Sequence, residues 1–272
     1  MKADNFPKYG YPCGVVIGLA FCTISGLRRS FREDAVRCIG RLKPSLQIVG
    51  KENIPQNGPC VITVNHYHRP GFGAEWLALG ISAVVPREIH WIMTAEWTAP
   101  GKWYEPFKGA YSRLLLRYLS RVYGYTTMPP MPPRPKDVEA RARSVRTTLE
   151  HARRHPDFML GLAPEGANQA GGKLSMPASG TGRFALLLAG LGSVFVPVGV
   201  YEEAGAFCLH FGPAYRLEIP STLSADEKDR AASETMMKAI AALVPVHLRG
   251  EFTTLLTPSS LANHPRGTAA GI

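Results

Sequence analysis

The sequence predicts an α/β fold: a single domain with a central, mostly parallel or mixed sheet flanked by helices, preceded by an N-terminal apolar segment that associates with a membrane. Three observations predict it. Short β-favouring runs alternate with segments whose apolar residues recur at helical spacing. Apolar residues make up 45% of the 272 positions, enough for one large core. Residues 9–27 contain no charged side chain. In such a fold, functional residues are expected at strand ends.

We expect the chain to divide into three parts. Residues 1–43 form an apolar segment with a basic collar, residues 44–256 form the α/β domain, and residues 257–272 form a loose tail. The uncharged stretch at 9–27 measures roughly 28 Å as a helix, about the thickness of a hydrocarbon core. Pro12 and four glycines interrupt it, so a spanning helix, an interfacial helix and a core helix remain alternatives.

The basic collar follows at residues 28–43, with six Lys and Arg residues against Glu33 and Asp34. A net charge of +4 beside an apolar segment is typical of a sequence that binds anionic headgroups and holds the following domain on the cytoplasmic side. We therefore expect attachment to the cytoplasmic face of the cell membrane, either peripherally or through a single N-terminal anchor.

The strands are expected where β-branched and other apolar residues cluster between turn formers. These runs are 45–50, 61–64, 90–95, 124–128, 158–163, 194–200 and 207–211. The run at 61–64 ends in Asn65-His66, and the run at 158–163 ends in Pro164-Glu165-Gly166. Two residue types that carry acid-base chemistry are thus expected at strand ends, a histidine and a carboxylate.

The helices are expected where apolar positions recur every three or four residues. These segments are 74–85, 111–122, 137–152, 183–191 and 225–244. Five prolines at 129–135 predict an extended connection. The segment 97–109 contains Trp97, Trp103, Tyr104 and Phe107 and is expected to be a loop that plugs a core edge, lines an acyl channel or rests at a membrane interface.

The composition favours an anionic partner, because 31 Lys and Arg residues against 21 Asp and Glu give a formal charge of +10. No zinc-finger spacing, RNP-like motif or long basic run points to nucleic acid, which we exclude as a partner. The five cysteines are scattered and form no CxxC pair, so they indicate reduced thiols. No set of His, Cys and acidic residues has ligand spacing, and we expect neither a metal nor a cofactor.

His66 is the first candidate catalytic residue. Imidazole has the side-chain pKa nearest neutrality, so at a strand end it can take a proton from an acceptor and return it within one turnover. The structural alternative is a histidine that caps the strand or bonds a neighbouring carbonyl.

Three stretches in order, GKENIPQNGPCVITVNH (50–66), MLGLAPEG (159–166) and VFVPVGV (194–200), resemble the glycerolipid acyltransferases related to bacterial 1-acylglycerol-3-phosphate acyltransferase. The resemblance implies an α/β acyltransferase on the inner membrane face that moves a fatty acyl group from an acyl-CoA or acyl-carrier-protein thioester to a hydroxyl. It also implies that His66 is the general base and that Glu165 lies near it.

The family places an aspartate five residues after the histidine, where it orients the imidazole. Here that position is Gly71. Glu75, one helical turn further on, and His68, two residues after His66, are the candidate catalytic replacements. A backbone carbonyl and Glu165 itself are further alternatives.

Two arginines that meet the acceptor phosphate in the family are also replaced, by Pro130 or a near neighbour and by Asn168. Their loss favours a neutral hydroxyl acceptor over a glycerol phosphate. Arg69 and Lys173 are candidates to restore a cation, although a surface role suits both. The expected substrate-binding residues are Asn65, Arg69, Glu165, Gly166, Asn168 and Lys173.

The resulting prediction is a membrane-associated O-acyltransferase whose acceptor is a lipid or lipid-like alcohol. The alternative is a catalytically weak or inactive lipid-binding protein of the same fold, which Gly71, Pro130 and Asn168 together motivate. A hydrolase is disfavoured because no G-x-S-x-G elbow is present.

Overall fold

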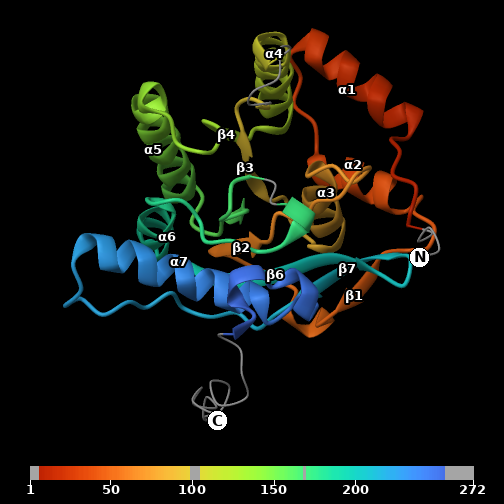
Figure 1. Cartoon of the computed structure of the whole chain (residues 1–272). Coiled ribbons are helices and arrows are strands. Elements are labelled where there is room, and N and C mark those ends of the chain that lie inside the picture. The colour runs from red at the N-terminus through yellow and green to blue at the C-terminus, as the bar shows by residue number, and fades with distance from the viewer. Residues whose placement is uncertain (1–5, 99–104, 168–169, 255–272) are drawn as a thin grey trace, which may run out of the picture.

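The computed structural model describes residues 6–98, 105–167 and 170–254 (Figure 1). In this part of the chain, seven strands form one sheet in the order β1-β7-β6-β2-β5-β3-β4. The strands are β1 (Gln47–Val49), β2 (Cys60–Val64), β3 (His90–Thr94), β4 (Thr126–Met128), β5 (Met159–Leu162), β6 (Val194–Glu203) and β7 (Ala206–Phe211). All neighbours are parallel except the antiparallel hairpin of β6 and β7. The predicted single α/β domain with a mostly parallel sheet is confirmed.

Helices cover both faces of the sheet (Figure 1). They are α1 (Cys13–Ser25), α2 (Phe31–Ile39), α3 (Glu75–Val84), α4 (Glu105–Tyr123), α5 (Val138–Arg154), α6 (Thr181–Ala189) and α7 (Ala225–Ala241). Side chains of β2 alternate between two cores: Ile62 packs in a cluster with α2 and α3, and Val61 packs in a second cluster with α5, α6 and α7. Since all five residues of β2 are buried, this strand fixes the centre of the domain.

The N-terminal segment forms two helices rather than one long apolar helix. Helix α1 has 13 residues, about 20 Å at 1.5 Å per residue, against a hydrocarbon core of about 30 Å. No helix among the residues that the structure describes has both the length and the apolar character needed to cross a bilayer. Helix α2 lies inside the basic collar, where we expected no helix. Ser30 caps it by accepting a bond from the Glu33 N–H.

Two elements are longer than the sequence predicts. Helix α4 begins at Glu105, so Phe107 belongs to a helix and not to the aromatic loop; Trp103 and Tyr104 lie outside the described residues. Strand β6 continues to Glu203 because its pairing with β7 extends past the end of β2. The tail expected at 257–272 also lies outside the described residues.

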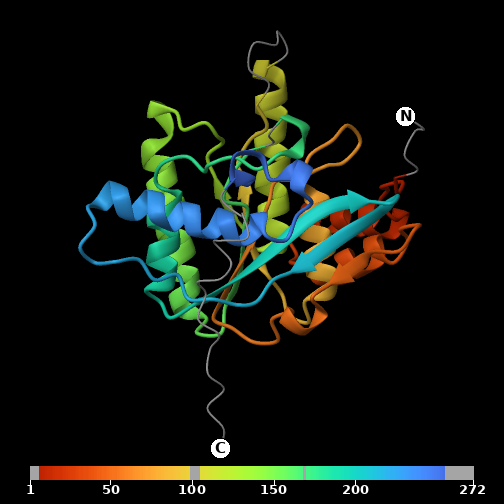
Figure 2. The same ribbon diagram turned by 60° about the horizontal axis from the view of Figure 1, so that its bottom comes forward.

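The parallel strands β2, β3, β4, β5 and β6 end at one edge of the sheet, which we call the carboxyl edge. Helix α4 extends past this edge, because its 19 residues measure about 28 Å, whereas the five residues of β3 measure about 17 Å. Figure 2 shows this overhang, with the yellow helix α4 rising above the sheet.

Candidate active site

Asn65 fixes the end of β2 against the extension of β6. Its Nδ2 donates to the Val200 carbonyl at 2.8 Å, and its Oδ1 accepts from the Val200 N–H at 2.6 Å. The side chain is 1% exposed. This amide replaces the backbone pairing that β2 loses where it ends. Asn65 is therefore a buried residue that fixes the chain directly before His66, and its expected role in substrate binding stays a prediction.

Glu165 links the two motifs that the sequence placed at strand ends. Its Oε2 accepts a hydrogen bond from the backbone N–H of His66 at 2.7 Å, and its Oε1 accepts from the Ser175 N–H at 3.0 Å. Burial raises the pKa of this carboxyl to about 7, although both backbone bonds lower it. One carboxylate thus holds together the end of β2, the end of β5 and the segment that leads to α6.

The turn after His66 explains the glycine at position 71. The Phe72 N–H donates to the Arg69 carbonyl at 3.1 Å, and Gly71 has φ of +84°. Pro70 followed by a glycine with positive φ is the pattern of a type II turn, which disfavours residues that have a Cβ. The position where the family carries aspartate is therefore occupied by a turn residue for reasons of backbone geometry.

The other two expected catalytic replacements lie on either side of this turn. Glu75 is the first residue of α3, is exposed, and accepts a bond from the Tyr11 hydroxyl at 2.9 Å. His68 is half-buried, and its backbone packs so closely on Gly172 that a Cβ there would lie 2.9 Å from the His68 carbonyl oxygen. The structure therefore brings His68 next to the segment that Glu165 holds, whereas the contact shown for Glu75 is with Tyr11.

Arg69 and Lys173 differ in what their charges meet. The Arg69 guanidinium forms an ion pair with Glu202, whose side chain is fully buried, and Tyr9 and Tyr67 donate to the same carboxylate at 2.7 and 3.1 Å. Lys173 is exposed on the segment after Gly172. Asn168 lies outside the described residues. Arg69 therefore neutralises a buried carboxylate.

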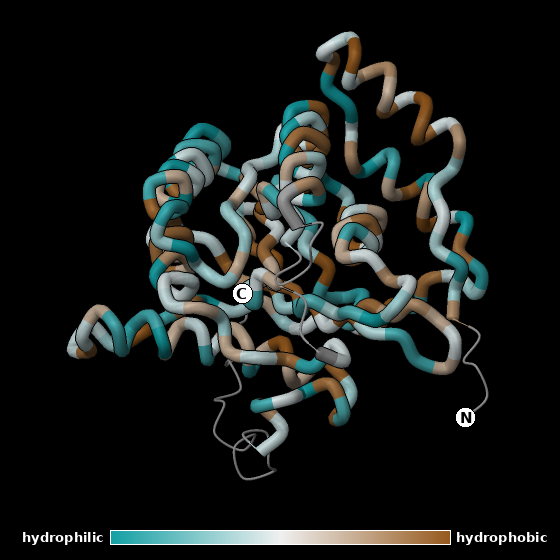
Figure 3. The backbone as a smooth tube through the Cα atoms, turned by 45° about the horizontal axis from the view of Figure 1, so that its top comes forward, coloured by the Kyte–Doolittle hydropathy of each residue, from teal (hydrophilic) through white to brown (hydrophobic). Residues whose placement is uncertain are grey.

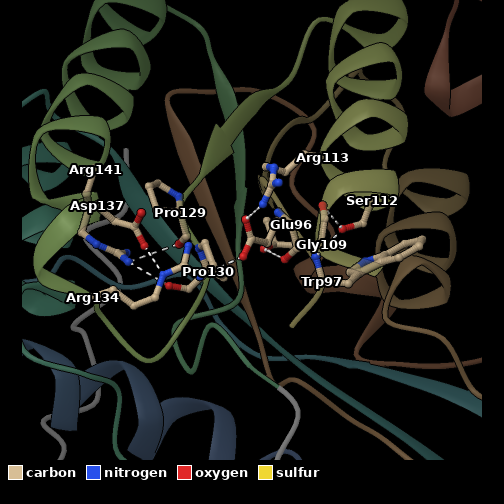
Figure 4. Close-up of polar contacts among 11 residues, drawn as sticks. Glu96, Trp97, Gly109, Ser112, Arg113, Pro129, Pro130, Arg134, Asp137 and Arg141 are labelled. Carbon is tan, nitrogen blue, oxygen red and sulfur yellow. Dashed lines mark hydrogen bonds and ion pairs between the residues drawn. The ribbon is translucent and has the colours of Figure 1, made fainter. Parts of the chain in front are cut away.

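Arginines also gather where β3 and β4 end (Figure 4). Glu96, two residues after β3, accepts from Arg113 on α4 and from Arg134 beyond β4, both at 2.8 Å. Arg134 also pairs with Asp137. Together, the hydrogen bonds from the two arginines outweigh the effect of burial and lower the pKa of Glu96. This cluster ties α4 to the connection that leads into α5.

The proline run is also held by a guanidinium. Arg141 Nη2 donates to the carbonyl oxygens of Pro129 and Pro130 at 3.2 and 3.0 Å (Figure 4). A Cβ on Gly166 would lie 2.7 Å from Met131 Cγ, so this run lies directly on the loop that carries Glu165. Sequence reasoning found no arginine at position 130 and missed Arg134 and Arg141. The strand-end rule that singled out His66 after β2 would also have singled out Glu96 after β3.

The family that the chain belongs to is shown by a family model. The family model described as acyltransferase matches residues 45–201, more than half of the chain. Among solved structures, the chain resembles the 1-acyl-sn-glycerophosphate acyltransferase PlsC from Thermotoga maritima, with a TM-score of 0.49, 15% sequence identity, and coverage of 84% of this chain and 88% of that one. No curated protein matches.

Proposed function

Because this chain belongs to the acyltransferase family, we propose that it is an O-acyltransferase that moves a fatty acyl group from an acyl-CoA or acyl-carrier-protein thioester to a hydroxyl of a lipid or lipid-like acceptor. The observation that carries the proposal is the 2.7 Å bond between Glu165 Oε2 and the His66 N–H. It joins the histidine motif to the Pro-Glu-Gly motif at the carboxyl edge, next to the part of the fold where α/β proteins bind ligands.

His66 acts as the general base in this proposal. The imidazole takes the proton of the acceptor hydroxyl as the oxygen attacks the thioester carbonyl carbon, the carbon–sulfur bond breaks, and the departing thiolate receives the proton. His66 is half-buried at the end of a fully buried strand, so the ring is held on a rigid element. Glu165 sets the backbone from which the ring projects.

The test is the variant His66→Ala, which we expect to lose transfer from a long-chain acyl thioester by at least about 10²-fold. The matched control is His155→Ala, which removes an exposed histidine directly after the last residue of α5. Melting temperatures of both variants show whether they fold. Retained transfer by a folded His66→Ala variant would remove this histidine from the mechanism.

A lipid-binding protein without transferase chemistry is the second candidate function. It is favoured by the type II turn at Gly71, which leaves no aspartate at the position that orients the base in the family. Incubation of the purified protein with acyl-CoA and a lipid extract separates the two candidates. A new ester in the lipid fraction supports the transferase, and bound lipid without any new ester supports the binding protein.

Attachment to the cytoplasmic face of a membrane is part of the proposal. Helix α1 exposes Val16, Ile17, Phe21 and Ile24, and its tube in Figure 3 is largely in the hydrophobic colours at the periphery of the molecule. A short apolar helix beside basic residues fits an orientation in the interface plane. Anionic lipid headgroups suit the formal charge of +10.

A further inference from the structure

A broad hollow in the described part of the chain lies beside the loop that carries His66. Its volume is about 1270 Å³, and it opens widely to solvent. Its lining comes from segments far apart in the sequence: the N-terminal segment, the chain after α2, the turn of the β6-β7 hairpin and the segment after α7. Ligand pockets commonly measure about 300 to 1,000 Å³, so the groove is large enough for a ligand of nucleotide size.

The groove contains several basic side chains. Lys8, Arg41 and Lys43 line it, and His247 lies on its rim. All four are exposed, and no ion pair joins the three Lys and Arg side chains to a carboxylate among residues 6–98, 105–167 and 170–254. Three unneutralised cations around one hollow attract an anion, and more strongly than three cations spread over a convex surface.

The acidic residues of the groove do not cancel this charge. Glu202 is neutralised by its ion pair with Arg69. Glu203 is the other carboxylate in the lining, which leaves two net positive charges from Lys8, Arg41 and Lys43. The arginines near the ends of β2 and β3 differ from these groove cations, because each of them forms an ion pair with a carboxylate. They are Arg69, Arg113 and Arg134.

The groove lies next to the candidate active site, because two of the segments that line it are connected to His66 through the chain or through hydrogen bonds. Tyr67, which lines the groove, directly follows His66. On the other side, Leu248, next to His247, accepts a backbone bond from Leu174 at 2.8 Å. The residue after Leu174 is Ser175, whose N–H donates to the carboxylate that also binds His66. A ligand in the groove therefore lies beside the loop from which the proposed base projects.

Resting on the proposed transferase function, we propose that this groove binds the phosphorylated nucleotide part of a coenzyme A thioester. That group carries a diphosphate and a further phosphate on its ribose, which suits three cations that come from two segments, Lys8 from the N-terminal segment and Arg41 and Lys43 from the chain after α2. Phe6 and Tyr67 add aromatic surface to the lining. The collar residues Arg41 and Lys43, which we expected to bind lipid headgroups, bind the acyl donor in this assignment.

The binding test uses coenzyme A, pantetheine, glycerol 3-phosphate and inorganic phosphate as probes, measured by calorimetry on the full chain. We expect coenzyme A to bind at low salt, and the double variant Arg41→Gln/Lys43→Gln to weaken its binding by about 10- to 100-fold. Neither side chain makes a hydrogen bond or ion pair in the described structure, so this variant is expected to fold. The matched control is Lys51→Gln/Arg153→Gln, two exposed cations outside the groove.

Two results would overturn the proposal: equal coenzyme A affinity in the two double variants, or glycerol 3-phosphate as the ligand whose affinity falls. Inorganic phosphate binding with no preference for coenzyme A would also overturn it. If the groove variant does not fold, Lys8→Gln in the wild-type background supplies the same comparison.

Kinetics separate this proposal from the proposed function. The groove variant is expected to raise KM for long-chain acyl-CoA by about tenfold and to leave transfer from an acyl-pantetheine donor unchanged. An unchanged KM for acyl-CoA in an active enzyme refutes the groove assignment alone. Absence of transfer from both donors in the wild-type protein refutes the transferase function.

Discussion

The backbone N–H of His66 donates to Glu165 Oε2 at 2.7 Å, although 99 positions separate the two residues in the sequence. The carboxylate is 4% exposed, and its second oxygen accepts from the Ser175 N–H. Within residues 6–98, 105–167 and 170–254, this buried carboxylate accepts hydrogen bonds from backbone N–H groups and forms no ion pair, so it carries its charge at a cost. The position of the proposed base therefore depends on a carboxyl group whose ionisation is finely balanced near neutral pH.

The first prediction concerns that ionisation. Burial raises the pKa of Glu165 to about 7 in the folded protein, whereas an unfolded glutamate titrates near 4.3. A raised folded pKa means that this carboxyl stabilises the fold fully below the unfolded pKa, and that the contribution is lost as pH rises through about 7. The loss between pH 5 and pH 8 is on the order of 3 kcal/mol.

Urea unfolding at these two pH values checks this prediction. Glu165→Gln is expected to show a smaller difference between the two unfolding free energies than the wild type, because its amide does not titrate. The control Glu52→Gln changes an exposed carboxylate and is expected to keep the wild-type difference. If Glu165→Gln kept it as well, another group would be responsible for the pH dependence.

The second prediction concerns Gly71. Restoring the family's aspartate by Gly71→Asp is expected to destabilise the fold by about 1 to 2 kcal/mol. The φ of +84° places this residue in the left-handed region, where a Cβ comes too close to the backbone. We also expect no gain in acyl transfer. Gly71→Ala imposes the same backbone strain without a carboxylate and is the control. Transfer that is clearly faster in the aspartate variant than in the alanine variant would show that a carboxylate at this position reaches the base.

The third prediction concerns Arg69 and Glu202. Removing one member of a buried ion pair leaves the other unpaired, so Arg69→Met is expected to lower the unfolding free energy by about 3 to 5 kcal/mol. Adding Glu202→Gln is expected to recover much of this loss. Because Arg69 is already committed to Glu202, the folded double variant is expected to keep its KM for the acceptor. A KM that rises more than tenfold would identify Arg69 as an acceptor ligand.

Local patterns predicted most of the fold, because each strand and helix depends on spacing that is visible within one segment. The run at 61–64 became β2, and the valines at 194–200 became β6. Helix α2 was missed because the charges of its nine residues dominate the segment, and its apolar face appears only against α3. The early start of α4 was missed because its first residues follow a segment rich in Pro, Gly and aromatic residues.

The site was predicted only in part, because its partners meet through the sheet. The family resemblance predicted that Glu165 lies near His66. In the structure the two residues follow the neighbouring strands β5 and β2. The partners of Arg69 and Glu96 were not predictable, because Glu202 and Arg134 are brought to them by strand order and not by spacing. The basic groove has the same origin, since five separate segments form it.

The last prediction concerns the face of α4 that overhangs the carboxyl edge. Phe107, Tyr111, Leu114 and Tyr118 recur at helical spacing on one face, with exposed fractions of 73, 65, 55 and 37%. Lys108, Arg113, Arg117 and Arg121 lie on the same helix. An exposed apolar face on a basic helix is the arrangement of helices that lie on anionic membranes. We expect α4 to contact the bilayer together with α1 and to bring the carboxyl edge to the lipid acceptor.

Sedimentation with vesicles of neutral and anionic lipids tests this contact. Phe107→Ser/Leu114→Ser is expected to weaken binding to anionic vesicles by about tenfold or more, because each side chain loses part of an apolar contribution of about 1.5 to 3 kcal/mol. Val138→Ser/Leu187→Ser removes two apolar residues of similar exposure, 67 and 51%, from α5 and α6 and is expected to bind as the wild type does. Equal weakening in both double variants would show that binding follows general surface hydrophobicity and that α4 has no special role.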